Sequence, residues 1–304
     1  MSVREAETPQ CSNATCPTIK QIIEPKEKDL GGFSVRRVLP ANEYKRVGPF
    51  IFFDHMGPSH FKAGDGVDVR PHPHIGLSTL TFLFEGGMMH LDSLGYVQEI
   101  APGAVNWMTA GSGIVHSERT PEALRATGYD LHGIQSWIAL PDGEEEIAPS
   151  FTHIPASDLP VIEVDGCTLT LIAGSAFNRS SPVTTHSPLF YLHTQAPAGT
   201  RIPLPIGYDE RALYVVEGEI DVDGSPFGNH HMVIIEPGAN PDIRAKSATR
   251  AMLLGGAPLA SDRIVWWNFS ASSQARIEQA KQDWLDGKFA PIEGETEFIP
   301  LPRK

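Results

Sequence analysis

Two pairs of side chains are candidates for metal chemistry. His72 and His74 form the first pair, and His116 and Glu118 form the second. Side chains alternate along a β-strand, so residues two positions apart share a face of the sheet. The two members of each pair are therefore expected to point the same way. Two adjacent strands of a small barrel that carry these pairs inward would bring three imidazoles and one carboxylate to a single point.

This donor set suits a divalent metal with open coordination positions. Imidazole is a ligand for Fe, Zn, Cu and Ni, and sites with two or three His plus a carboxylate suit oxygen chemistry at Fe(II). Metal–nitrogen bonds of roughly 2 Å require the rings to converge. Because the chain has 12 histidines, a lone His-x-His pair has little weight, and hydrogen-bonded histidines without a metal are the alternative. The two pairs together, both in strand-like sequence, favour the metal site.

The composition excludes several other classes of function. The chain has 304 residues and a net charge of −13, which excludes strong unspecific binding to nucleic acid because such binding needs a basic face. No apolar run is long enough to span a membrane, and the N-terminus has no signal-peptide pattern. Cys11, Cys16 and Cys167 are too few for a disulfide framework and are interpreted as free thiols in a reducing compartment. We expect a soluble, cytoplasmic protein.

The elements that must position the two pairs are short strands. From Phe33 onward, apolar runs rich in β-branched and aromatic residues alternate with Gly, Pro and Asp, as is typical of antiparallel sandwiches and barrels. Two apolar strands with an internal Glu-Gly, within residues 82–87 and 214–220, are each followed by a Pro-Gly turn. This weak internal similarity indicates two copies of one β unit.

We therefore predict an all-β fold with three parts. Residues 1–30 are polar and are expected to form an irregular tail. Residues 31–143 are expected to form the first barrel with the metal site, and residues 150–304 the second barrel with a short terminal helix. The last region contains the only stretch with helical spacing, and Ser272 or Ser273 is expected to cap it.

Several motifs resemble a known family. The stretches GDGVDVRPHPHIGLSTLTFLFEGG and APGAVNWMTAGSGIVHSER resemble the two motifs of a cupin barrel. In detail these motifs, with FIFFDHMGP and LHGIQSWIALP, resemble the pirin family. The resemblance covers about residues 33–290. It implies two cupin barrels of the jelly-roll (double-stranded β-helix) type, packed together, with a C-terminal helix.

The resemblance also implies a ligand set and a cofactor. In pirins the N-terminal barrel binds one iron, most simply Fe(2+), through three His and one Glu, which correspond here to His72, His74, His116 and Glu118. The second barrel has no His-x-His at the matching place and is expected to be metal-free. A general cupin has a Glu near Ser78, so this departure is expected to change the surroundings of the metal.

Two functions from different classes remain open. Several bacterial pirins resemble quercetin 2,3-dioxygenases, oxidoreductases that cleave a flavonol ring with O2 and release carbon monoxide; here Glu118 would be the catalytic base that accepts the substrate's hydroxyl proton. This quercetinase reading requires a small aromatic substrate and O2. The alternative is a non-catalytic, iron-binding, redox-responsive regulator that binds a protein partner and has no direct contact with nucleic acid or membrane. A structural metal with no open position is a third possibility.

Other residues of the first barrel have weaker signals. One set is apolar and would either line a pocket beside the metal or pack in the core: Phe52, Phe53, Phe82, Phe84, Trp107 and Met108. A second set would either contact the ligands or substrate, or serve as ordinary histidines: His55, His60 and His90.

Overall fold

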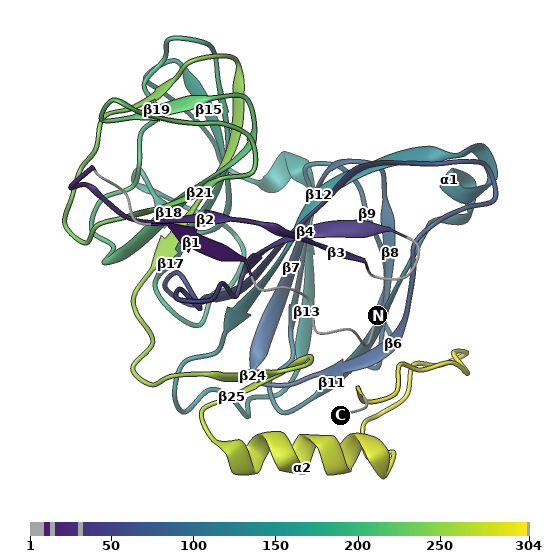
Figure 1. Ribbon diagram of the computed structural model, residues 1–304. Helices are drawn as coiled ribbons and strands as arrows, with labels where there is room; N and C mark the ends of the chain where they lie inside the picture. Colours follow the sequence, from purple (N-terminus) through teal and green to yellow (C-terminus); the bar gives the residue numbers. More distant parts are fainter. Residues whose placement is uncertain (1–8, 13–15, 30–32, 303–304) are drawn as a thin grey trace.

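The computed structural model describes residues 9–12, 16–29 and 33–302. Its regular structure is almost entirely antiparallel β-sheet, which confirms the predicted all-β class. Two barrels lie side by side, and a helix lies below the first of them (Figure 1). No helix in these ranges is long and apolar enough to cross a membrane.

The first barrel is built from two facing sheets. Its seven-stranded sheet has the order β13 (Ser150–Ile154), β10 (Val105–Thr109), β7 (Leu77–Glu85), β12 (Tyr129–Ala139), β5 (Phe50–Phe61), β4 (Ser34–Leu39) and β3 (Lys26–Asp29). Its four-stranded sheet has the order β6 (Asp68–His74), β11 (Ile114–Arg119), β8 (Met88–Asp92) and β9 (Val97–Ile100).

The second barrel is built in the same way. Its large sheet follows the path β1 (Gln10–Ser12), β2 (Ile19–Glu24), β21 (Met232–Ile235), β18 (Glu210–Glu217), β23 (Thr249–Gly256), β17 (Leu189–Ala196), β15 (Cys167–Ala176) and β14 (Val161–Val164), with β16 (Arg179–Ser180) paired to β15. A smaller sheet contains β20 (Ser225–Phe227), β19 (Ile220–Val222) and β22 (Ile243–Ala245).

The two barrels share an apolar core, and strand alternation decides which residues enter it. Along β5, Phe53 points to the second barrel and packs against Tyr214 with ring centroids 5.0 Å apart. Its neighbours Phe52 and Asp54 point to the interior of the first barrel. The same strand therefore builds the inter-barrel core with one face and the cavity wall with the other.

The prediction of an irregular N-terminal tail over residues 1–30 was wrong for the described part, while residues 1–8, 13–15 and 30 lie outside it. In β2, buried and exposed residues alternate through IKQIIE, and the strand pairs with β21 of the second barrel. β3 then pairs with β4 of the first barrel. The segment was mistaken for a tail because it contains exposed Lys20 and Glu24 and buried Gln21 among its isoleucines, which makes its average composition polar.

The assignment of residues 150–304 to the second barrel also needs correction. β13 extends the first barrel by pairing with β10. After the second barrel, β24 (Ile264–Trp266) and β25 (Phe269–Ala271) return to the first, where Ile75 forms a bridge with Phe269. These pairings are long-range, and neither composition nor spacing reports them.

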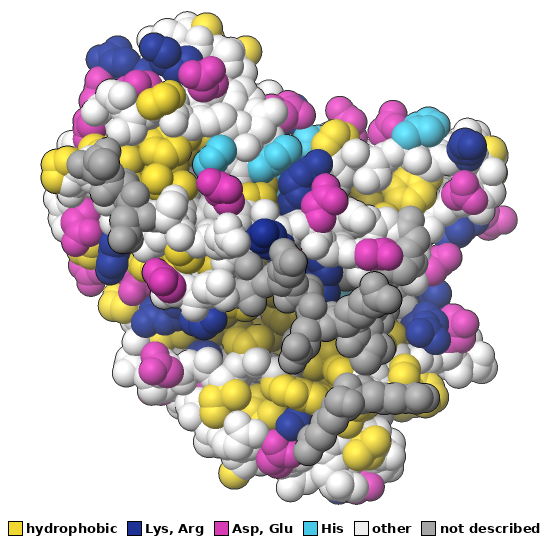
Figure 2. Space-filling view, viewed as in Figure 1, with side chains coloured by type: hydrophobic (Ala, Val, Ile, Leu, Met, Phe, Trp, Pro, Cys, Tyr) yellow, Lys and Arg dark blue, Asp and Glu magenta, His cyan; other side chains and the backbone are white. Residues whose placement is uncertain are grey.

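The terminal helix α2 (Gln274–Leu285) begins as predicted, because the Ser273 hydroxyl accepts a hydrogen bond from the Arg276 amide. It is not the only helical segment of the described residues, because a short helix α1 (Glu122–Thr127) and a 3₁₀ turn at Ala156–Asp158 also occur. On the face in Figure 2, acidic side chains are interspersed with Lys and Arg, and histidines gather where the barrels meet.

We predict that Ile23→Ala lowers the free energy of unfolding by about 2–5 kcal/mol, because Ile23 is fully buried in the core between the barrels. Chemical denaturation followed by tryptophan fluorescence measures this loss. The exposed neighbour Glu24→Ala is the control and should change stability by less than about 0.5 kcal/mol. Equal stability of the two variants would restore the interpretation of a loose tail.

Candidate metal centre

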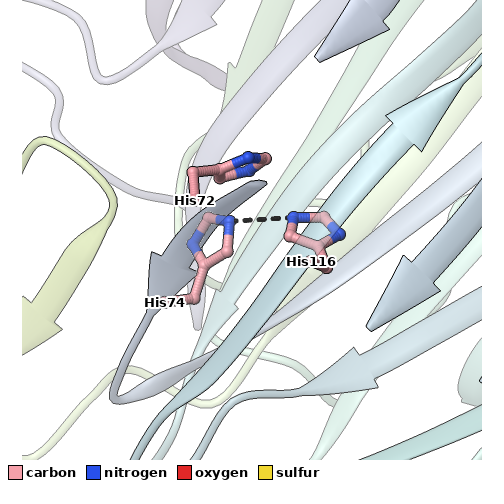
Figure 3. Close-up of side chains that lie close together, drawn as sticks. All are labelled: His72, His74 and His116. Atoms are coloured by element: carbon pink, nitrogen blue, oxygen red, sulfur yellow. Dashed lines mark hydrogen bonds between the residues drawn. The ribbon is translucent and has the colours of Figure 1, made fainter. Parts of the chain in front are cut away.

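Three histidines converge inside the first barrel. His72, His74 and His116 each offer a ring nitrogen, and these three atoms all lie within 4.8 Å of one another. Figure 3 shows the rings turned toward one another, with Nε2 of His74 3.1 Å from Nε2 of His116. Two ligands bonded to one ion at roughly 2.0–2.1 Å lie about 3 Å apart, so the spacing fits a shared metal.

The pairing of two strands creates this convergence. β6 runs antiparallel to β11, and His116 lies directly opposite His72 while Ile114 lies opposite His74. Because His72 and His74 are two positions apart, they share the face that looks into the barrel. All three rings are almost completely removed from solvent, with exposed fractions of 4%, 1% and 2% in chain order.

Backbone carbonyls fix the orientation of the first two rings. His72 Nδ1 lies 2.9 Å from the Arg70 carbonyl oxygen, and His74 Nδ1 lies 3.0 Å from that of Asn268. A carbonyl only accepts, so each Nδ1 carries the proton and donates it. Each Nε2 then keeps a lone pair for a metal, which is the arrangement that metal-binding histidines show.

A buried carboxylate fixes the third ring through another histidine. His90 Nε2 lies 2.9 Å from Asp92 Oδ2, and His90 Nδ1 lies 3.4 Å from His116 Nδ1. Asp92 also accepts the amide N–H groups of Leu94 and Tyr96 at 2.9 and 3.1 Å. In a neutral His90 that donates to Asp92, Nδ1 is the acceptor for the His116 Nδ1 proton. His116 Nε2 is thereby left free for a metal.

Burial also keeps the three rings uncharged. It lowers the pKa of His72 to about 4 and holds the pKa values of His74 and His116 well below the usual value, and the neighbouring imidazoles add to the effect. Neutral imidazole is the form that binds a metal. The donor set of this cluster therefore fits a divalent ion of the Fe, Ni or Zn type.

Glu118 lines the same cavity as the three histidines. The register of β11 with β6 shifts between His116 and Glu118, while on the other side Glu118 lies opposite His90 of β8. The carboxylate lies outside the group of three whose donors are within 4.8 Å of one another. Burial raises the pKa of Glu118 to about 7. The four-ligand set predicted from the sequence therefore has three members in contact and one close by.

The cluster opens into a cavity of about 560 Å³ between the two sheets of the first barrel. Trp137 meets His74 edge-on with ring centroids 5.2 Å apart, and it stacks on Phe52 at 3.9 Å. Arg37 covers the other face of Phe52 at 4.3 Å. An aromatic wall therefore runs from the histidines toward the opposite sheet.

A row of polar side chains crosses that opposite sheet, each directly opposite the next on the neighbouring strand. The row consists of Arg37, Asp54, Gln135, Thr81, Asn106 and His153. Arg37 donates to both oxygens of Asp54 at 2.8 and 2.7 Å, and Thr81 donates to Gln135 Oε1 at 2.7 Å. Arg37, Asp54 and Gln135 give the cavity a polar wall that faces the histidines, while Thr81 and Asn106 line the small void beside His116.

The weaker sequence signals divide between the cavity and the core. Phe52 lines the cavity, and Met108 lines a small void beside His116. The other aromatic candidates pack in or against the inter-barrel core: Phe53, Phe82, Phe84 and Trp107. His90 contacts His116 as described, whereas His60 is exposed.

His55 lies away from the cluster, at the junction of the barrels. Its Nδ1 is 2.8 Å from the Tyr214 hydroxyl, and its Nε2 is 2.8 Å from His132 Nε2. Of the two interpretations that the sequence left open for His55, the structure favours an ordinary histidine over a contact with the metal ligands or substrate. Alternation along β5 turns His55 to the opposite side of the sheet from Asp54.

Sequence reasoning missed the polar wall. Asp54 interrupts the apolar run FIFFDHM, and Gln135 interrupts HGIQSW. A polar residue inside an otherwise apolar strand is a signal for a functional interior, because burying it costs free energy unless it is paired. Asn268 was also missed, and its carbonyl reaches His74 only through the return of the chain after the second barrel.

Comparisons with known proteins agree with this architecture. The pirin family model matches residues 32–138, and the model of the pirin C-terminal cupin domain matches residues 191–290. A pirin-like protein from Caulobacter vibrioides is 49% identical over 288 residues, 93% of this chain and 99% of its own length. The chain belongs to the pirin family.

Solved structures extend the comparison. A quercetin 2,3-dioxygenase from Acinetobacter baumannii superposes with a TM-score of 0.86 at 37% identity, over 94% of this chain and 96% of its own. A bacterial pirin from Escherichia coli in complex with nickel(II) has a TM-score of 0.60 at 22% identity, over 77% of this chain and 96% of its own. At that identity the likeness shows the fold alone. The fold of this pirin is therefore the two-cupin fold predicted from its motifs.

We predict that Asp92→Asn weakens metal binding by this pirin about 10- to 100-fold. The amide oxygen still accepts the N–H groups of Leu94 and Tyr96, but its own N–H faces His90 Nε2 and forces the other tautomer of His90. The proton of His116 then moves to Nε2, the atom that a metal needs. Competition with a chromophoric chelator measures the affinity.

Asp130→Asn is the matched control, because Asp130 makes the same carboxylate–histidine contact with exposed His60 at 2.8 Å. That variant should bind metal like the parent protein. Equal metal affinity in the two variants, with both folded by circular dichroism, would contradict the role assigned to Asp92.

Proposed function

We propose that this pirin is a metal-dependent dioxygenase that opens the ring of a flavonol, a quercetin-like substrate, with O2. The observation that carries the proposal is the set of three buried, converging Nε2 donors on the wall of a cavity of about 560 Å³. The similarity to the quercetin 2,3-dioxygenase from Acinetobacter baumannii, at 37% identity over almost the whole chain, supports the choice of substrate class.

The ion would be held by His72, His74 and His116, with Glu118 as the fourth ligand. We propose iron in the cell, because neutral imidazoles with a carboxylate form a donor set that suits Fe(II). When bound, such an ion supplies Lewis acidity and redox chemistry toward O2. Substrate binding and proton transfer are assigned to the side chains around the cavity.

Binding of an aromatic substrate is favoured by the cavity wall next to the histidines. Phe52 and Trp137 present apolar surface there, and Trp267 adds a further ring. Asn268, which is 3% exposed, has an Nδ2 group with no hydrogen-bond partner in the described residues. Because an unpartnered buried donor costs free energy, a carbonyl or enolate oxygen of the substrate is a fitting acceptor for it.

Proton transfer is assigned to Glu118. Its carboxylate is close to the histidines and lines both the main cavity and the small void beside His116. In this position an Oε atom is able to accept the proton of the substrate's hydroxyl group, which leaves the electron-rich enolate that reacts with O2. Burial around Glu118 favours its protonated form, so the carboxyl group is suited to hold this proton until the product receives it.

We predict ring cleavage when the protein is loaded anaerobically with Fe(II), Ni(II), Co(II), Mn(II) or Cu(II) and then given quercetin and O2. One flavonol and one O2 yield one ester-linked product and one carbon monoxide, so flavonol absorbance, oxygen uptake and carbon monoxide are measured together. Removal of the metal with a chelator should abolish turnover. Unchanged flavonol absorbance with all five metals would reject the proposed function.

We predict that Glu118→Gln lowers kcat by about 10²–10⁴-fold, because the amide cannot accept the substrate's proton. Metal content is measured in the same samples to separate loss of the base from loss of a ligand. The control is Glu217→Gln at a half-exposed carboxylate on the second barrel, where the activity should be retained. A fully metal-loaded Glu118→Gln variant with parental kcat would remove Glu118 from the mechanism.

A further inference from the structure

The cavity wall opposite the histidines contains a cation without a carboxylate of its own. Lys28 of β3 is half-buried and lines the cavity. Within the described residues its ammonium group makes no hydrogen bond or ion pair. Burial lowers the pKa of Lys28, and the guanidinium of Arg37 adds to this effect. The Asp54 carboxylate attracts this charge and offsets part of the cost of burying it, but both of its oxygens already accept hydrogen bonds from Arg37.

The other charged side chains around the cavity are either paired or lie on another part of its wall. Arg37 is bound through two hydrogen bonds to Asp54, and Asp68 is bound to Arg125 at 2.7 Å. Glu118 lies on the far side with the metal ligands. Arg70 is exposed at the rim. Lys28 is thus a half-buried cation on this wall whose ammonium group has no hydrogen-bonded carboxylate among the described residues, so it is available to bind an anion from outside the chain.

Hydrogen-bond donors extend the same wall. The Gln135 side chain lines the cavity, and its Oε1 atom already accepts the Thr81 hydroxyl proton. Its amide N–H groups are therefore the part that remains for a ligand. Gln135 lies on β12 and Lys28 on β3, with β5 and β4 between them, so these two side chains would contact different parts of a ligand. A half-buried cation recognises an oxygen that bears negative charge, and charge-assisted hydrogen bonds of this kind are the stronger ones.

We propose that Lys28 forms a subsite for an ionisable hydroxyl group on the end of the substrate that lies away from the metal. The inference rests on the proposed function and deepens it. It assigns the substrate class as a flavonol that carries an acidic phenol on a ring remote from its metal-chelating 3-hydroxy-4-keto group. The phenol binds as a phenolate whose oxygen accepts a hydrogen bond from the Lys28 ammonium group.

Two ligands separate this subsite from the metal site. Quercetin and 3-hydroxyflavone share the 3-hydroxy-4-keto group, but only quercetin carries the additional phenols. Anaerobic titration of the metal-loaded protein, followed by the ligand's absorbance, gives both dissociation constants without turnover. We expect the parent protein to bind quercetin at least about tenfold more tightly, which is the effect of one charge-assisted hydrogen bond.

Lys28→Met should remove that preference by weakening quercetin about tenfold while leaving 3-hydroxyflavone within about twofold. Lys28→Arg keeps the cation and should restore most of the preference. Lys26→Met is the control on the same strand, because Lys26 does not line the cavity. Metal content and thermal unfolding are measured for each variant, and the ligand comparison on the parent protein stands even if one variant fails to fold.

The outcomes distinguish the two proposals. Equal affinity of the parent protein for both flavonols, or equal weakening of both by Lys28→Met, would overturn the subsite while leaving the dioxygenase proposal intact. Absence of binding for either flavonol at any loaded metal would overturn the dioxygenase proposal itself, and the subsite with it.

Discussion

The antiparallel pairing of β6 with β11 is the constraint on which the rest of the centre depends. It sets His116 opposite His72, and strand alternation brings His74 to the same side. A slip of one residue would turn these rings out of the barrel. Three neutral imidazoles facing one another are poorly satisfied without an ion, because each has an unused lone pair in a buried place. The strands must therefore be held in register by something other than the rings.

The chain after the second barrel provides that support. Ile75 accepts a hydrogen bond from the Ser270 amide at 3.1 Å, and Pro71 accepts one from Ile299 at 2.8 Å, so both ends of the His72–His74 segment are braced. Gly76 has φ +67°, and a Cβ there would collide with the Ser270 carbonyl. The glycine of the HPHIG motif thus allows this close approach. On β11, Glu295 binds the Ser117 hydroxyl at 3.0 Å.

These long-range contacts explain which parts of the fold and of the metal centre the sequence alone predicts. The two ligand pairs, the strand class and the cap at Ser273 depend on local alternation and spacing, which a single sequence displays. The roles of Asp92 and Asn268 depend on which distant segments become neighbours, and no local pattern reports that. β2 and β3 were missed for a different reason: Lys20, Gln21 and Glu24 give β2 a polar average composition although Ile19 and Ile23 are buried, and β3 consists of charged residues.

The polar wall shows why such departures from a plain core are informative. Apolar side chains at Asp54 and Thr81 would pack the first barrel at lower cost, because each buried polar group must recover about 1–3 kcal/mol of desolvation through a partner. Arg37 and Gln135 provide those partners within the row, and so does His153 for Asn106 at 2.7 Å. The second barrel has an extensive apolar cluster in its interior instead. The two copies of the β unit thus have different interiors. The interior of the first barrel is less densely packed with apolar side chains and contains a cavity, and the wall that faces the histidines carries charged groups and hydrogen-bond donors.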